Sequence, residues 1–120
     1  MLKAEHRLRR PVDFRTTARR GVRVGRPRIV VHFLPPDVTA STGPPTVGFT
    51  VGRAVGNAVA RNTVKRRLRH LMAARVGRIP EGARVVVRAL PPAAGASSAL
   101  LAADLDAALD RALTRGGQRR

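Results

Sequence analysis

The densest functional chemistry in this sequence is a basic segment, residues 53–78, with eight lysine and arginine residues and no acid. Arginine donates paired N–H bonds to phosphate oxygens, and several arginines four residues apart can follow a phosphate backbone. Asn62 adds a donor and an acceptor, which can contact a base edge or a 2′-hydroxyl. Because ordinary surface helices mix both signs of charge, the missing acids favour polyanion binding over a solvated helix.

The spacing of these basic residues predicts that they share one face of a helix. At about 100° per residue, four basic side chains and one amide side chain fall within roughly 140° of one another on the helix. We call this set the basic stripe: Arg61, Asn62, Lys65, Arg66 and Arg69. Arg67 falls on the opposite flank and is a weaker candidate. An adjacent apolar face would dock on the rest of the protein, and it contains Val64, Leu68, Leu71 and Met72.

The whole chain carries a strong positive charge. Its 120 residues hold 24 Lys and Arg against 7 Asp and Glu, a net charge of +17. Residues 1–80 have 18 bases and 3 acids, whereas residues 81–120 have 6 and 4. At 43% hydrophobic residues the chain can bury a core, so we expect one folded domain, residues 1–120, and a polyanionic partner.

The residues needed for protein-based catalysis are not grouped in this sequence. There is no cysteine, and the histidines at positions 6, 32 and 70 do not have the spacing of a metal site. Three acids, Asp104, Asp106 and Asp110, lie close together, but in the least basic region, where they suit helix solubility. We therefore predict no catalytic residue and no metal ligand in the chain itself.

Hydrophobic patterns and turn residues predict an α+β fold of order α-β-β-α-β-α, with helices over one face of a small sheet. We expect Asn57 to cap the basic helix and Ser97 or Ser98 to cap the last helix. The first two strands, separated by a proline-rich loop over residues 35–45, are predicted to be antiparallel neighbours. A basic arm over residues 1–10 and a disordered tail over residues 116–120 flank the fold. The predicted helices cover residues 11–19, 57–75 and 98–115, and the predicted strands cover residues 28–34, 46–51 and 83–90.

One stretch, residues 47–69 (VGFTVGRAVGNAVARNTVKRRLR), resembles the protein component of bacterial ribonuclease P. The shared pattern runs from a strand and basic turn into Gly-Asn-Ala-Val at residues 56–59, and then into the bases of the stripe. The sequence departs from the family at Thr63, where the third residue of an Arg-Asn-Arg motif is expected, and at Ala18 and His32, where aromatic residues are expected. The resemblance extends over about residues 5–115, with further matches at Arg7, Leu8, Asp13, Phe14 and Gly21.

The resemblance implies a role in removing the 5′ leader from precursor tRNA. In this family a large RNA subunit performs the hydrolysis with Mg²⁺, and the protein binds that RNA and holds the leader between its sheet and first helix. The protein alone would bind no cofactor. The implied fold is a two-layer α/β sandwich with a mixed sheet and a left-handed βαβ crossover. We further expect a cytoplasmic protein with no membrane contact, present as a monomer in a one-to-one complex with the RNA.

Residue by residue, the resemblance assigns the basic stripe to the catalytic RNA and Arg53 to its rim. It assigns four residues to the leader cleft: Phe14, Val30, His32 and Thr50. Phe14 could instead be a core residue, and His32 a half-buried strand histidine. Two other functions stay open, a structural RNA-binding protein of ribosomal type and a DNA-binding helix; the latter requires a second helix a short turn away.

Overall fold

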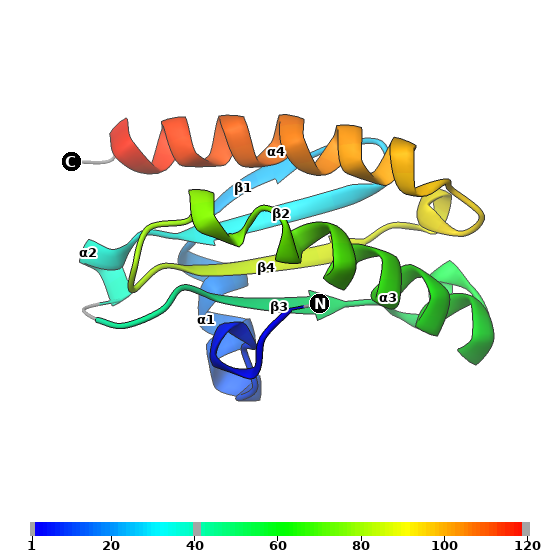
Figure 1. Cartoon of the computed structure of the whole chain (residues 1–120), viewed down its shortest axis with the longest axis horizontal. Helices are drawn as coiled ribbons and strands as arrows, with labels where there is room; N and C mark the ends of the chain where they lie inside the picture. Colours follow the sequence, from blue (N-terminus) through cyan, green and yellow to red (C-terminus); the bar gives the residue numbers. More distant parts are fainter. Residues whose placement is uncertain (1, 40–41, 119–120) are drawn as a thin grey trace.

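The computed structural model describes residues 2–39 and 42–118 and contains a four-stranded sheet in the order β1-β2-β4-β3 (Figure 1). Neighbours β1 and β2, and β2 and β4, are antiparallel, whereas β3 and β4 are parallel. The strands are β1 (Val22–Gly25), β2 (Ile29–Leu34), β3 (Thr46–Thr50) and β4 (Arg84–Ala89). The helices are α1 (Pro11–Arg20), α2 (Pro36–Thr39), α3 (Ala58–Ala73) and α4 (Ser98–Gln118).

The helix ends form where the capping residues predict. Asn57 Oδ1 accepts a 2.9 Å hydrogen bond from the Ala60 N–H at the start of α3, and Ser97 Oγ accepts one of 3.2 Å from the Leu100 N–H at the start of α4. However, α4 continues to Gln118 rather than ending at residue 115, and Gly116 is buried against the Phe33 ring. The predicted tail therefore begins too early, and residues 119–120 lie outside the described part of the chain.

Two predictions about the sheet are wrong. A fourth strand, β1, was not predicted, because its sequence Val-Arg-Val-Gly is short and only half apolar. In addition, β2 and β3 are not neighbours, because β4 lies between them. Val85, Val86 and Val87 of β4 are all buried, as expected for a strand with neighbours on both sides and helices on both faces. The loop between β2 and β3 also contains the short helix α2.

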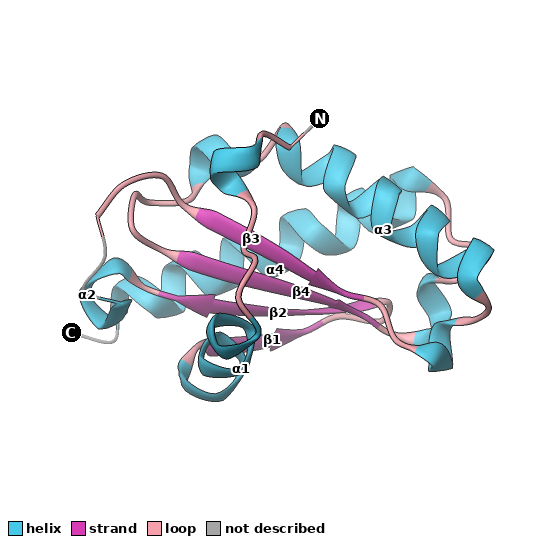
Figure 2. Ribbon diagram, turned by 90° about the horizontal axis from the view of Figure 1, so that it is seen from below, coloured by secondary structure: helices cyan, strands magenta, loops and turns pink. Residues whose placement is uncertain are grey.

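Helices cover both faces of the sheet, not one. Figure 2 shows α3 and α4 on one side and α1 on the other. The main core lies on the side of α3 and α4, where Ile29, Val31 and Phe33 of β2 meet buried residues such as Leu68 and Leu105. The opposite side of β2 presents Val30, His32 and Leu34 toward the layer that contains α1. This second face is where the predicted leader cleft would lie.

The connection from β3 through α3 to β4 is left-handed. In Figure 1 both strands run from left to right, α3 crosses in front of the sheet, and β4 lies above β3. If Figure 1 is turned by a quarter so that both strands point up, α3 lies in front of the sheet and β4 lies to the left of β3. A right-handed crossover would place β4 to the right. Nearly all parallel crossovers have the opposite hand, so the crossover implied by the resemblance is a distinctive feature of this fold.

The N-terminal arm covers the β3 edge of the sheet. Leu2 is buried in the main core, and the Leu8 N–H donates a 2.9 Å hydrogen bond to the Val47 carbonyl. His6 Nδ1 lies 2.8 Å from the Pro45 carbonyl oxygen. The arm thus runs from the α3 side of the sheet to the α1 side and supplies partners to an otherwise open edge.

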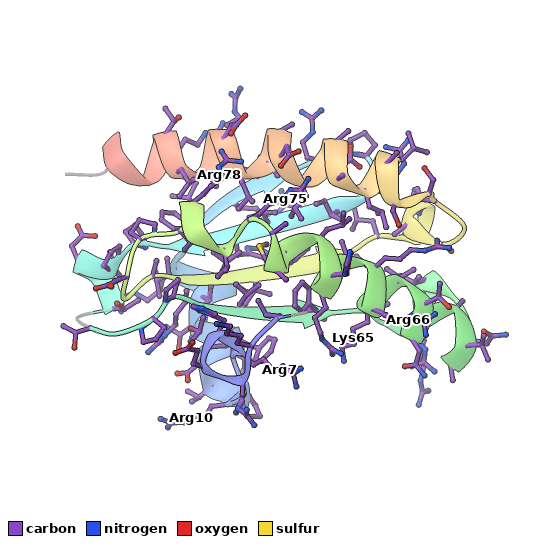
Figure 3. The ribbon with its side chains drawn as sticks, viewed as in Figure 1. Arg7, Arg10, Lys65, Arg66, Arg75 and Arg78 are labelled. Atoms are coloured by element: carbon purple, nitrogen blue, oxygen red, sulfur yellow. The ribbon has the colours of Figure 1, made fainter. Side chains whose placement is uncertain are left out.

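The acids of α4 anchor this helix, in contrast to the role in solubility predicted for them. Asp104 is buried and accepts hydrogen bonds from the Arg28 N–H at 3.2 Å and from Arg28 Nη1 at 3.1 Å. Asp106 accepts from Arg75 Nε at 2.6 Å, and Asp110 pairs with Arg78. Figure 3 shows Arg75 and Arg78 in the space between α3 and α4. Within residues 2–39 and 42–118, no helix is long and apolar enough to cross a membrane.

Candidate nucleic-acid interface

The basic stripe forms an open surface along the first three turns of α3. Asn62, Lys65 and Arg66 are exposed, and Arg61 and Arg69 are half-buried. Figure 3 shows Lys65 and Arg66 extending away from α4, toward the side of the molecule that also carries Arg7 and Arg10 of the N-terminal arm. Arg53 is exposed in the 3₁₀ turn Arg53–Val55 that immediately precedes α3.

The stripe keeps its positive charge because its bases have no acidic partner. In the described residues, ion pairs within 4.0 Å involve Arg28, Arg75, Arg78 and Arg84, and none involves the stripe or Arg53. At the other end of α3, the hydrogen bond from Arg75 is the main reason that the pKa of Asp106 is lowered. Charge is thus neutralised beside α4 and left free toward the β3 edge.

Two arginines of α3 have an additional structural role. Arg67 Nη1 donates a 2.7 Å hydrogen bond to the Ala96 carbonyl, so it anchors α3 to the segment before α4. Its weaker candidacy for RNA contact, predicted from its flank position, agrees with this anchoring. Arg61 has a buried Nε without a hydrogen-bond partner, so its stem packs against the protein while its guanidinium lies at the border of the stripe.

A cleft of about 590 Å³ opens on the α1 side of the sheet. Three of the four predicted leader-cleft residues, Phe14, His32 and Thr50, line it. The fourth, Val30, lies on the same face of β2 as His32, in register between Gly25 and Arg88, but it is 3% exposed and does not line the cleft. The assignment of Val30 to the leader cleft stays a prediction.

Phe14 combines its two predicted roles. Its ring packs so closely on Gly48 of β3 that a Cβ atom at that position would overlap ring carbons Cε2 and Cζ. The ring is nevertheless only half-buried, and its remaining surface lines the cleft. Gly48 therefore sets the depth at which the ring lies, and Phe14 is both a packing residue and a cleft residue.

His32 is more buried than the half-buried strand histidine that the sequence suggested. Only 7% of it is exposed, and its Nδ1 atom is enclosed without a hydrogen-bond partner. Burial lowers the pKa of His32 below its ordinary 6.5, and the positive charges of Arg23 and Arg88 lower it further. The ring is therefore neutral at pH 7.

Sequence reasoning missed three arginines that line the cleft: Arg15 of α1, Arg23 of β1 and Arg88 of β4. Arg23 is on the strand that was not predicted, so its register with His32 could not be derived. For Arg88 a signal existed. Arg84 and Arg88 interrupt an otherwise apolar strand at positions of the same parity, which places both on the face opposite Val85 and Val87.

The stripe and the cleft meet at the β3 edge. A hollow of about 130 Å³ there is lined by Phe14, by Lys65 and Arg69 of the stripe, and by Arg7 of the arm. Phe14 therefore lines both the cleft and this hollow, so the two regions adjoin each other at the edge of the sheet. In the described part of the chain, no group of three His, Cys, Asp or Glu side chains is placed to hold a metal ion.

Comparison with known proteins decides the family. A family model described as Ribonuclease P matches residues 2–113. The chain belongs to the ribonuclease P protein family. It is 55% identical over 123 residues to the ribonuclease P protein component of Streptomyces avermitilis, covering 98% of this chain and 100% of that protein. It is 58% identical over 111 residues to the corresponding protein of a Nocardioides species, covering 92% and 94%.

Solved ribonuclease P proteins have the same fold. The Staphylococcus aureus protein superposes with a TM-score of 0.77 at 25% identity, over 92% of this chain and 96% of that one. The Thermotoga maritima protein gives 0.73 at 26% identity, over 88% and 96%. Family membership means a part in tRNA 5′ processing, within an endoribonuclease complex in which the protein works with an RNA subunit. It also removes the ribosomal and DNA-binding alternatives, and in chain order α3 is flanked by strands β3 and β4 rather than by another α-helix.

Proposed function

We propose that this ribonuclease P protein binds the RNA subunit through the basic stripe and Arg53, and holds the 5′ leader of precursor tRNA in the cleft. The RNA subunit, with Mg²⁺, performs the hydrolysis. The protein contributes affinity for the precursor tRNA and holds its leader in position. One protein per RNA is the expected stoichiometry, and action in the cytoplasm stays a prediction.

The observation that carries this proposal is that, among residues 2–39 and 42–118, no acid pairs with the stripe. Elsewhere in the described fold, Asp13, Asp104, Asp106 and Asp110 neutralise arginines. The stripe and Arg53 have no such neutralisation, so their charges repel one another until a polyanion arrives. Binding of phosphates relieves this repulsion and releases counterions, which makes RNA binding favourable and salt-dependent.

The cleft supports the leader assignment through its shape and surroundings. It lies between α1 and the sheet and adjoins the stripe through Phe14. An RNA strand leaving the surface of the RNA subunit can therefore enter the cleft without crossing an acidic region. Phe14 offers one aromatic surface for a base, and Thr50 offers a hydroxyl.

Reconstitution tests the proposal. The purified protein is added to a bacterial ribonuclease P RNA at a Mg²⁺ concentration that limits the RNA alone, and cleavage of precursor tRNA is measured. We expect the protein to accelerate cleavage at the mature 5′ end. If the protein binds the RNA subunit but cleavage is not accelerated, the proposed function is wrong.

A further inference from the structure

Arginines from separate strands converge on one side of the cleft. Arg23 of β1 is the direct cross-strand partner of His32, and Arg88 of β4 is the direct partner of Thr50. Directly paired residues project from the same face of a sheet. Arg23, His32, Thr50 and Arg88 therefore share the face that forms the cleft floor, and all four line the cleft.

The Arg23 side chain extends along this floor. Its Nη1 atom lies 4.0 Å from the position that a Cβ atom on Gly25 would occupy. Gly25 is in register with Val30, and Val30 is in register with Arg88. Arg23 thus reaches from the row of His32 toward the row of Arg88.

These two arginines have no acidic partner in the described residues. Arg84, on the same face of β4, pairs with Asp13 of α1 at 3.4 Å, which neutralises the far end of this face. Arg88 and Arg23 form no such pair, and no acid lines the cleft. Arg15 adds a third positive charge to the lining from α1.

His32 supplies a hydrogen-bond donor between the arginines. Its Nδ1 is enclosed and unpartnered, which leaves Nε2 as the ring nitrogen that can reach the cleft. A neutral ring carries one proton, and a proton on Nδ1 would be a buried N–H without an acceptor, which proteins rarely tolerate. The proton is therefore better placed on Nε2, where it can be donated into the cleft.

We propose that Arg23, Arg88 and the Nε2–H of His32 form a binding site for one phosphodiester of the leader, an inference that rests on the proposed function. All three groups donate and none accepts, which matches a phosphate and not the mixed edge of a base. One phosphate of the leader is then bound by ion pairs and hydrogen bonds at this site. The same cleft has Ala18 and His32 in place of the aromatic residues expected for base stacking.

The test measures leader preference in the reconstituted complex, as the ratio of the affinities for precursor and mature tRNA. The double variant Arg23→Gln/Arg88→Gln is compared with Arg19→Gln/Arg111→Gln, which removes the same charge from exposed sites outside the cleft. We expect the cleft variant to lose roughly tenfold or more in the ratio, the order of a charge-assisted hydrogen bond. The control variant should keep the wild-type ratio.

A second arm identifies the phosphate that is bound. Single neutral methylphosphonate linkages are placed along the leader. In the wild-type complex one position should lower the affinity, and in the cleft variant that position should have no further effect. The inference is overturned if the cleft variant keeps the wild-type ratio, or if it loses affinity for the RNA subunit instead. A wild-type ratio of one would contradict the proposed leader cleft itself, and thermal unfolding of each variant verifies its fold.

Discussion

At the residue scale, the contact between Gly48 and Phe14 affects both the stability of the fold and the position of the Phe14 ring in the cleft. Adding a methyl group in Gly48→Ala would push against the Phe14 ring. We expect this variant to lose about 1–3 kcal/mol of unfolding free energy, the usual cost of overpacking, and to lower leader preference because the ring moves within the cleft. Urea unfolding followed by circular dichroism measures the first effect, and the ratio of precursor to mature tRNA affinity measures the second.

Gly52→Ala is the matched control for this substitution. A Cβ atom at Gly52 would meet nothing within 4 Å, and this glycine also lines the cleft. We expect its unfolding free energy to stay within about 0.5 kcal/mol of the wild type. Equal stability of Gly48→Ala and Gly52→Ala would show that Gly48 does not set the ring position.

His32 should make stability depend on pH. Its pKa is lowered in the folded protein, chiefly by burial and then by Arg23 and Arg88. The unfolded chain therefore binds more protons than the folded one as pH falls below 6.5, and the unfolding free energy decreases from there down through the folded-state pKa. His32→Gln should lack this decrease, whereas Thr50→Val, a change in the same cleft, should retain it. Chemical unfolding at several pH values tests this, and an unchanged slope in His32→Gln would contradict it.

The sequence predicts the residues of the stripe better than those of the cleft. Positions 61–69 lie on one helix, so a single period of 3.6 residues suffices to place them on one face. The cleft combines α1, β1, β2, β3 and β4, and its members meet only through strand register. Arg23 was missed for that reason, and the alternation of β2 did not reveal that Val30, on the same face as His32, is almost fully buried.

At the element scale, different parts of α3 make different contacts. Its first three turns carry the basic residues of the stripe, which have no acidic partner in the described residues. Leu68 and Met72 in its second half pack in the core, and the residues after its end pair with acids of α4. The acids of α4 could not be interpreted correctly from the sequence, because Arg28 and Asp104 are 76 residues apart. Only the packing of α4 beside β1 and β2 brings them together.

The stripe predicts a measurable salt effect. Lys65→Ala/Arg66→Ala removes two exposed charges from α3 without touching the core. We expect weaker binding to the RNA subunit and a log–log salt slope that is shallower by about 1.4–1.8, because each lost phosphate contact removes about 0.7–0.9. Titrations at several salt concentrations, with Arg111→Ala as a control for lost surface charge, measure this slope. A slope equal to that of the wild type would mean that the stripe is not the RNA-binding surface.

The order of strands was harder to predict than their existence. The segments at residues 28–34, 46–51 and 83–90 all form strands close to their predicted bounds. Sequential strands usually pair, which suggested β2 beside β3. The left-handed crossover instead returns β4 between them, and the composition of β4, with three buried valines in succession, is the only local sign of that central position.

At the scale of the whole molecule, the charge of +17 is divided between surfaces. The arm, the stripe and the cleft adjoin the β3 edge, whereas three of the seven acids, Asp104, Asp106 and Asp110, hold α4 in place. In the proposed function, this arrangement gives one protein two adjoining contacts, one for the RNA subunit and one for the leader. The stripe and the cleft should therefore contact different RNAs.

Crosslinking tests that claim most directly, since the chain has no cysteine and a single introduced one can be labelled alone. A photoreactive group is attached in Ala54→Cys, in the cleft lining, and in Val59→Cys, which is 74% exposed beside the stripe. In the reconstituted complex with precursor tRNA, the Ala54→Cys probe should crosslink the leader and the Val59→Cys probe the RNA subunit. Crosslinking of both probes to the same RNA, or to the opposite partners, would contradict the account.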